Sequence, residues 1–153
     1  MKSNITRLVA LIFSCVFLFG AFSTVSASSN RASDYFSYTE VWATPQGNGK
    51  FIVEFDINAT HRMDQLGADK IYIWEQQSDG SYDNVKTFTS GLIDTNTSAA
   101  YRRVSYSGTS GVKYYATVVL YAKDSSGSEK IYSDTRVITA LSLIHISEPT
   151  RPY

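Results

Sequence analysis

The sequence predicts an all-β domain, an antiparallel sandwich of about seven strands. Three observations point to this class. Nearly every patterned segment alternates apolar and polar residues with a period of two. Clusters of Gly, Asp, Asn and Ser separate these segments at the spacing of turns. Only one short stretch, Met63–Gly67, favours a helical turn instead.

Each predicted strand rests on its own alternation. In the clearest case, four apolar residues from Phe51 to Ile57 alternate with mostly polar ones, which is typical of a half-buried strand. Asp79-Gly80 tolerates positive φ and predicts a hairpin. In chain order, the predicted strands are Tyr38–Ala43, Phe51–Asn58, Lys70–Glu75, Tyr82–Thr89, Ala100–Tyr106, Tyr114–Ala122 and Lys130–Thr139.

The first 27 residues have the pattern of a secretory signal peptide. Lys2 and Arg7 precede an apolar run, Leu8–Phe22, and the small residues Val25-Ser26-Ala27 follow it. This apolar run is shorter than a transmembrane helix usually requires. We therefore expect residues 1–27 to be removed and the mature chain, which then has no membrane span, to work outside the cell or at its surface. Residues 28–37 read as a polar leader.

The other end of the chain resembles something other than protein-coding sequence. Residues Leu141–Arg151 resemble the in-frame translation of a widely used sequencing adapter. We therefore expect residues 141–153 to be non-native and to make no packed contact with the domain, which then spans residues 38–140. On this interpretation the true C-terminus, and any lost downstream domain or wall anchor, stay open.

The charge and the cysteine content of the chain limit the kinds of partner and of stabilising bond that we expect. Residues 28–140 carry 11 basic and 13 acidic side chains, a net charge of −2, without a basic run. Nucleic acid and anionic membrane surfaces are therefore not expected partners. The single cysteine, Cys15, lies in the predicted signal peptide, so no disulfide is expected to stabilise the mature domain.

Two stretches resemble known families. Tyr114–Ala122, followed by a Ser/Gly turn and Ile131–Ser133, resembles the last two strands of fibronectin type III-like and immunoglobulin-like domains. Met63–Ala68, Lys70–Glu75 and Asp79–Tyr82 resemble small exported proteins of Gram-positive bacteria. The resemblance implies a β-sandwich architecture, and it implies no particular activity.

The residues that carry catalysis or metal binding are sparse. His61 is the one histidine before the adapter-like tail, and we expect it in a solvated loop where Arg62 lowers its basicity. Ile93-Asp94-Thr95 is similar to one aspartic protease motif, but Asn96 replaces its glycine and no second copy exists. Asp79, Asp83 and Asn84 match no calcium loop, and no serine lies in a nucleophile elbow. We therefore expect no catalytic residue, no metal and no cofactor.

One group of aromatic residues stands out. On the parity of their strands, Tyr72, Trp74, Tyr115 and Tyr121 share the outer face of one sheet, and Tyr132 adjoins them on the next strand. We expect the first four to lie side by side and to be substantially exposed. Such a face can anchor a protein or stack on sugar rings. It can also simply stabilise the sheet through cross-strand pairs.

The sequence thus predicts a secreted, non-catalytic domain for extracellular or cell-surface binding or adhesion. The partner, an extracellular protein or a glycan, stays open. One alternative is a carbohydrate-binding module. Another is a hydrolase that uses two carboxylates about 5–10 Å apart in a cleft. A cleft lined by two such groups would favour the enzyme, and a flat aromatic face would favour the binder.

Overall fold

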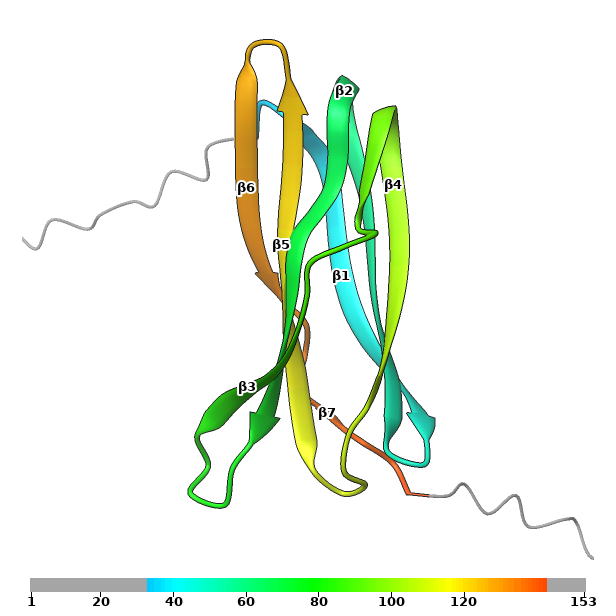
Figure 1. The fold of residues 1–153 in the computed structure, drawn as a ribbon, viewed down its shortest axis with the longest axis vertical. Coiled ribbons are helices and arrows are strands. Elements are labelled where there is room, and N and C mark those ends of the chain that lie inside the picture. Colours follow the sequence, from blue (N-terminus) through cyan, green and yellow to red (C-terminus); the bar gives the residue numbers. More distant parts are fainter. Residues whose placement is uncertain (1–32, 143–153) are drawn as a thin grey trace, which may run out of the picture. The chain divides into compact units, whose positions relative to one another are not determined.

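The computed structural model describes residues 33–142, which form an antiparallel sheet of seven strands (Figure 1). The all-β class and the antiparallel strands predicted from sequence are confirmed. The predicted signal peptide and residues 143–153 of the predicted tail lie outside the described residues. The strands are β1 (Phe36–Gly47), β2 (Lys50–Gln76), β3 (Tyr82–Phe88), β4 (Ile93–Ser107), β5 (Lys113–Asp124), β6 (Gly127–Asp134) and β7 (Ile138–Thr139). In this part of the chain, nothing helical is both long and apolar enough to span a bilayer.

The sheet is organised around β2, which has 27 residues. Its first part, Lys50–Asn58, pairs with β1 on one side and β4 on the other. Its last part, Lys70–Gln76, pairs with β3 and β5, and β5 in turn pairs with β6 and β7. We call the two groups the first half-sheet (β1, β2 to Asn58, and β4 from Ala99) and the second half-sheet (β2 from Lys70, β3, β5 and β6). Figure 1 shows how strongly the sheet curls as β2 passes from one to the other.

The core lies inside this curl, where the apolar faces of both half-sheets meet. Apolar burial at alternate positions is the main stabilising term for such a sheet. The inner faces predicted for β2 and β5 are confirmed, since these side chains are fully buried: Phe51, Val53, Phe55, Ile57, Ile71, Ile73, Tyr114, Ala116, Val118, Leu120 and Ala122.

The predicted helical turn at Met63–Gly67 is wrong. Met63, Gln65, Leu66 and Gly67 pair with β4, and Gln65–Gly67 also pairs with β5. Met63 and Leu66 are buried in the core cluster. Pairing on both sides satisfies the backbone and buries these side chains, so tertiary packing overrides the local preference. The two strands predicted on either side of this stretch are therefore one strand, β2.

At the C-terminal end, the predicted strand Lys130–Thr139 is divided into β6 and β7. Thr135 interrupts the strand regularity but stays attached to β5, because its amide donates to Ala116 O and its Oγ1 accepts from Ala116 N, at 2.9 and 3.0 Å. The number of strands is seven, as predicted, because two predicted strands are joined in β2 and one predicted strand is divided into β6 and β7.

Both predicted flanking segments touch the domain. In the predicted leader, Phe36 is buried and already belongs to β1, and Ser33 donates a hydrogen bond to Glu129 at 2.6 Å. At the other end, Gly49 N donates to Leu141 O at 2.7 Å. Leu141 is thus hydrogen-bonded to the domain, although it is 43% exposed, and the prediction that residues 141–153 make no packed contact stays a prediction.

Candidate functional site

The sequence-predicted aromatic residues do lie on one face of the second half-sheet. Tyr72 and Trp74 are on β2, and Trp74 is the direct cross-strand partner of Tyr115 on β5. Strand alternation places them opposite the buried Ile71 and Ile73. The face is therefore the outer surface of the curl, as the parity argument predicted.

Four rings form a continuous row, which we call the aromatic row: Tyr72, Trp74, Tyr115 and Tyr82. Trp74 and Tyr115 are stacked, with centroids 5.9 Å apart and planes inclined by 12°. Tyr72 lies 6.1 Å from Trp74 on one side, and Tyr82 meets Tyr115 edge-on at 4.9 Å on the other. Trp74 and Tyr115 thus each have two aromatic neighbours, so part of each ring is already covered within the domain.

A short chain of hydrogen bonds fixes the row to the edge strand. Trp74 Nε1 donates to Thr117 Oγ1 at 3.0 Å, and Thr117 Oγ1 donates to Asp134 Oδ1 on β6. The indole N–H, which is the one polar group that Trp74 could offer to a ligand, is therefore already used within the domain.

Tyr121 and Tyr132 lie on the same face but outside the aromatic row. Lys130 reaches over Tyr121, with Nζ 5.6 Å from the ring centroid, and donates to Asp69 Oδ2 at 2.8 Å. The hydrogen bond to Asp69 raises the pKa of Lys130. Tyr132 on edge strand β6 is 71% exposed and projects from the face without an aromatic neighbour among residues 33–142.

The expectation of substantial exposure is wrong for Tyr72, Trp74, Tyr115 and Tyr121, which are half-buried. The rings cover one another and the strand surface beneath them. Val119, which points to this outer face, is 2% exposed. Of the five predicted site residues, only Tyr132 is freely accessible.

Sequence reasoning missed a second aromatic group on the outer face of the first half-sheet. Trp42 on β1 and Tyr101 on β4 lie on either side of Glu54 on β2, with ring centroids 6.5 Å apart. Trp42 Nε1 donates to Glu54 Oε2 at 2.8 Å, and the Tyr101 hydroxyl donates to Glu54 Oε1. The hydrogen bond to Glu54 raises the pKa of Tyr101. We refer to these three residues as the Trp42 group.

The Trp42 group is more open than the aromatic row. Tyr101 is 46% exposed, and Tyr38, further along the same face of β1, is 43% exposed. Alternation could have found these residues, since Trp42 stands between the apolar Val41 and Ala43 and so belongs to the opposite face. What the sequence could not supply is the register that brings Trp42, Glu54 and Tyr101 together across three strands.

His61 does not lie in a loop, contrary to the prediction. It belongs to β2, its side chain is 53% exposed, and its Nε2 lies 2.7 Å from Asp124 Oδ2 at the end of β5. Hydrogen bonds from Ser126, first, and from His61 lower the pKa of the Asp124 carboxyl. The imidazole thus joins the middle of β2 to the β5–β6 hairpin, and its nearest charged group is a carboxylate rather than Arg62.

The remaining polar candidates have structural partners. Asp94 contacts Arg102, and the Asp79 carboxylate accepts from the amide and hydroxyl of Ser81 within its turn. Within residues 33–142, His, Cys, Asp and Glu do not assemble in groups of three that could hold a metal ion.

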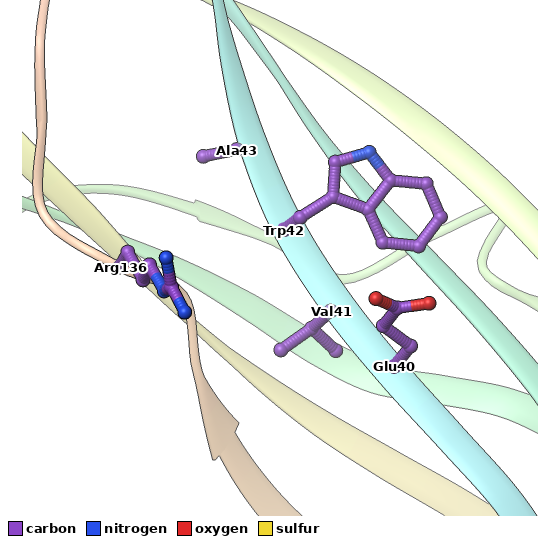
Figure 2. Close-up of a pocket in the computed structure, with 5 residues that line it drawn as sticks. All are labelled: Glu40, Val41, Trp42, Ala43 and Arg136. Atoms are coloured by element: carbon purple, nitrogen blue, oxygen red, sulfur yellow. The ribbon is translucent and has the colours of Figure 1, made fainter.

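One hollow of about 290 Å³ opens at the free edge of β1 (Figure 2). Val41, Ala43 and Arg136 line one side of it, and Glu40 and Trp42 belong to the same stretch of β1. In Figure 2, Glu40 and Trp42 project from the side of β1 that faces away from Arg136. The hollow therefore lies between an edge strand and the Thr135–Val137 connection from β6 to β7.

Comparisons with known proteins give no family. No protein-family model matches the chain, and no curated protein matches it. Among solved structures, one match is titled "X-ray structure of Northeast Structural Genomics Consortium target SoR45". It is 13% identical, covers 80% of this chain and 99% of its own, and superposes with a TM-score of 0.41. A likeness at this level says nothing about function.

Proposed function

We propose that this protein is a secreted, non-catalytic domain for binding or adhesion outside the cell or at its surface, with an immunoglobulin-like or fibronectin type III-like architecture. Strand pairing supports the architecture when the two parts of β2 are counted as separate strands. The second strand then lies between the first and fifth, and the sixth lies between the third and seventh. Immunoglobulin-type sandwiches divide their strands between two sheets in this order.

The observation that carries the binding function is the outer face of the second half-sheet. It presents the aromatic row next to the exposed Tyr132, which lies on β6, the last strand of the path β1-β2-β5-β6. Tyrosine and tryptophan dominate the anchors of protein interfaces. A pre-packed row of rings also loses little side-chain entropy on association.

A protein partner fits this face better than a glycan does. Sugar recognition needs a free ring face for stacking, and Trp74 and Tyr115 each already contact two neighbouring rings. The edges of the row and the whole ring of Tyr132 remain available to a protein surface. We therefore assign Tyr132 the role of central anchor and the row the role of a rigid platform.

The test compares two exposed tyrosines on opposite half-sheets, Tyr132→Ala and Tyr38→Ala, in binding to arrays of extracellular proteins and of glycans. Neither ring is buried, so both variants should fold. We expect Tyr132→Ala to weaken a protein signal at least about tenfold, the effect of a typical anchor, while Tyr38→Ala leaves it unchanged. Equal losses in both variants, or no protein signal for the unaltered domain, would overturn the assignment.

A carbohydrate-binding module is the second candidate, and the Trp42 group favours it. Here each aromatic ring has a single aromatic neighbour, and a carboxylate lies between the two rings, where it could also accept from sugar hydroxyls. Loss of a glycan signal in Trp42→Ala but not in Tyr132→Ala would support this candidate over a protein binder.

The hydrolase alternative has weaker support. Glu40 is the only carboxylate among the residues that line the hollow at β1, whereas a glycosidase needs two facing carboxylates. A hydrolytic rate that disappears in Glu40→Gln would revive it.

A further inference from the structure

β1 is a free edge of the curled sheet, away from the aromatic row and Tyr132. β1 is the end of the path β1-β2-β5-β6 and pairs only with β2 along 12 residues. An edge strand of this length presents a row of unpaired backbone N–H and C=O groups at alternate positions. Pro45 has no N–H, so the part of the edge that can pair extends from about Tyr38 to Thr44.

The other side of the hollow is an interruption in the opposite edge. β1 approaches β6 and β7 across the open side of the curl. β6 ends at Asp134 and β7 begins at Ile138, so the Thr135–Val137 connection leaves the strand geometry where it faces β1. The hollow of about 290 Å³ lies at this point.

The inner side chains of β1 lack the cover that their neighbours have. Val41 and Ala43 pair with Phe55 and Val53, which are fully buried, yet they remain half-buried themselves. Their unburied surface lines the hollow (Figure 2). An added strand with small apolar side chains at alternate positions would complete this edge of the core.

The positive charge of Arg136 at the hollow favours an occupant that carries a negative charge. The exposed guanidinium of Arg136 lines it and makes no ion pair or side-chain hydrogen bond within residues 33–142. Figure 2 shows Glu40 on the far side of β1, so it does not neutralise Arg136. Glu40 also lines the hollow, but it accepts a hydrogen bond from the Tyr38 hydroxyl. A carboxylate on the occupant would therefore complement Arg136 on the side of β1 from which Glu40 projects away. A second copy pairing through β1 would carry Arg136 at its own edge as well, so two like charges would meet near the shared edge, which disfavours self-pairing.

We infer that the hollow at the free edge of β1 accepts an extended segment of a partner protein, which adds to β1 as a strand and places a carboxylate beside Arg136. Backbone hydrogen bonds to β1 supply the affinity in this mode, and the side-chain positions at Val41, Ala43 and Arg136 supply the selectivity. This site is separate from Tyr132 and the aromatic row, so it stands or falls independently of the proposed function.

The test uses the mature chain and three synthetic ten-residue peptides that alternate alanine and threonine, with glutamate, glutamine or lysine at the centre. We expect the glutamate peptide to bind about tenfold more tightly than the lysine peptide, as one charge-assisted hydrogen bond would give. Arg136→Glu, an exposed position, should reverse this preference, and Tyr132→Ala should leave it unchanged. Amide exchange in β1 should slow when the peptide is bound, and N-methylation of alternate peptide amides should abolish binding.

Three results would overturn the inference. The first is that none of the peptides binds at millimolar concentration. The second is binding that Arg136→Glu leaves unaltered or that slows exchange in strands other than β1. The third is a concentration-dependent dimer of the unliganded chain whose interface protects the β1 amides, because the edge would then serve a second copy rather than a partner.

Discussion

The two half-sheets carry aromatic residues on their outer faces in different ways. In the second half-sheet, Trp74 is flanked by two tyrosines and its N–H is bound by Thr117. In the first, Trp42 has one aromatic neighbour and donates its N–H to a carboxylate, Glu54. Trp74 is therefore packed among other rings, whereas the aromatic neighbour of Trp42, Tyr101, is 46% exposed. What distinguishes them is the number of aromatic neighbours, which is two for Trp74 and one for Trp42.

The largest effect should come from breaking the joint between the halves, at Gly67. A Cβ on Gly67 would lie 2.0 Å from Leu92 O, a backbone atom that accepts from the amide of Ala68. We expect Gly67→Ala to cost roughly 3 kcal/mol or more of unfolding free energy, because the strands must separate to admit it. Urea denaturation measures the loss.

Gly80→Ala is the matched control for Gly67. Gly80 has a positive φ of 86° but open space around its Cβ position. Its substitution should cost about 1–2 kcal/mol from backbone strain alone. Equal losses in the two variants would show that the close approach of β2 to Leu92 contributes nothing.

The next largest effect separates the two tryptophans. Trp74→Ala removes two ring contacts and a hydrogen bond, and we expect it to destabilise the domain by about 2–3 kcal/mol. Trp42→Ala should cost about 1 kcal/mol, because it loses one ring contact and one hydrogen bond at a more open site. Thermal denaturation of both variants provides the comparison, and a reversed order would contradict the distinction drawn between the half-sheets.

A smaller effect should appear where the two halves meet in the core. Tyr114 on β5 packs against Phe51 of the first half-sheet at 5.2 Å, and its hydroxyl donates to Glu75 and accepts from Thr109 N. Burial, first, and the hydrogen bond to Glu75 raise the pKa of Tyr114. Tyr114→Phe keeps the packing and should cost about 1–2 kcal/mol, since Thr109 N loses its acceptor. An unchanged urea midpoint would mean that water replaces the hydroxyl.

The smallest effect concerns acid stability and the contact between His61 and Asp124. The folded state lowers the pKa of Asp124 below its ordinary value of 3.8. The carboxylate therefore contributes stability that is present above this value and is lost as the pH falls below it. Asp124→Asn should flatten the dependence of the urea midpoint on pH below about 4. Asp79→Asn is the comparison, because the pKa of Asp79 is also lowered, within a separate turn, but by a smaller shift, so this variant should flatten the dependence less. If Asp124→Asn leaves the urea midpoint's dependence on pH below about 4 unchanged, the contact between His61 and Asp124 does not contribute to acid stability.

The alternation of apolar and polar residues predicted most of the strands and which of their faces point into the core. The inner faces of β2 and β5 follow directly from alternation, because a strand has only two sides. It failed at Met63–Gly67, where Met, Gln and Leu suit a helix and only the pairing with β4 and β5 makes them a strand. The aromatic face was predicted, but the substantial exposure predicted for it is wrong. The parity argument did not include the strand of Tyr82, whose ring packs against Tyr115. The finer assignment to an immunoglobulin-like sandwich stays a prediction.

The length of β2 has a consequence for how the chain folds. β2 pairs with four of the other six strands, and two of them, β4 and β5, follow it after long intervals of sequence. The hairpin with β1 can form early, but β2 from Lys70 onward has no partner on one side until β5 has arrived. Pairings over such separations slow folding. A chain that ends before Lys113 would therefore leave the last part of β2, with Ile71 and Ile73, with an open edge, and we expect it to aggregate rather than to form a smaller domain.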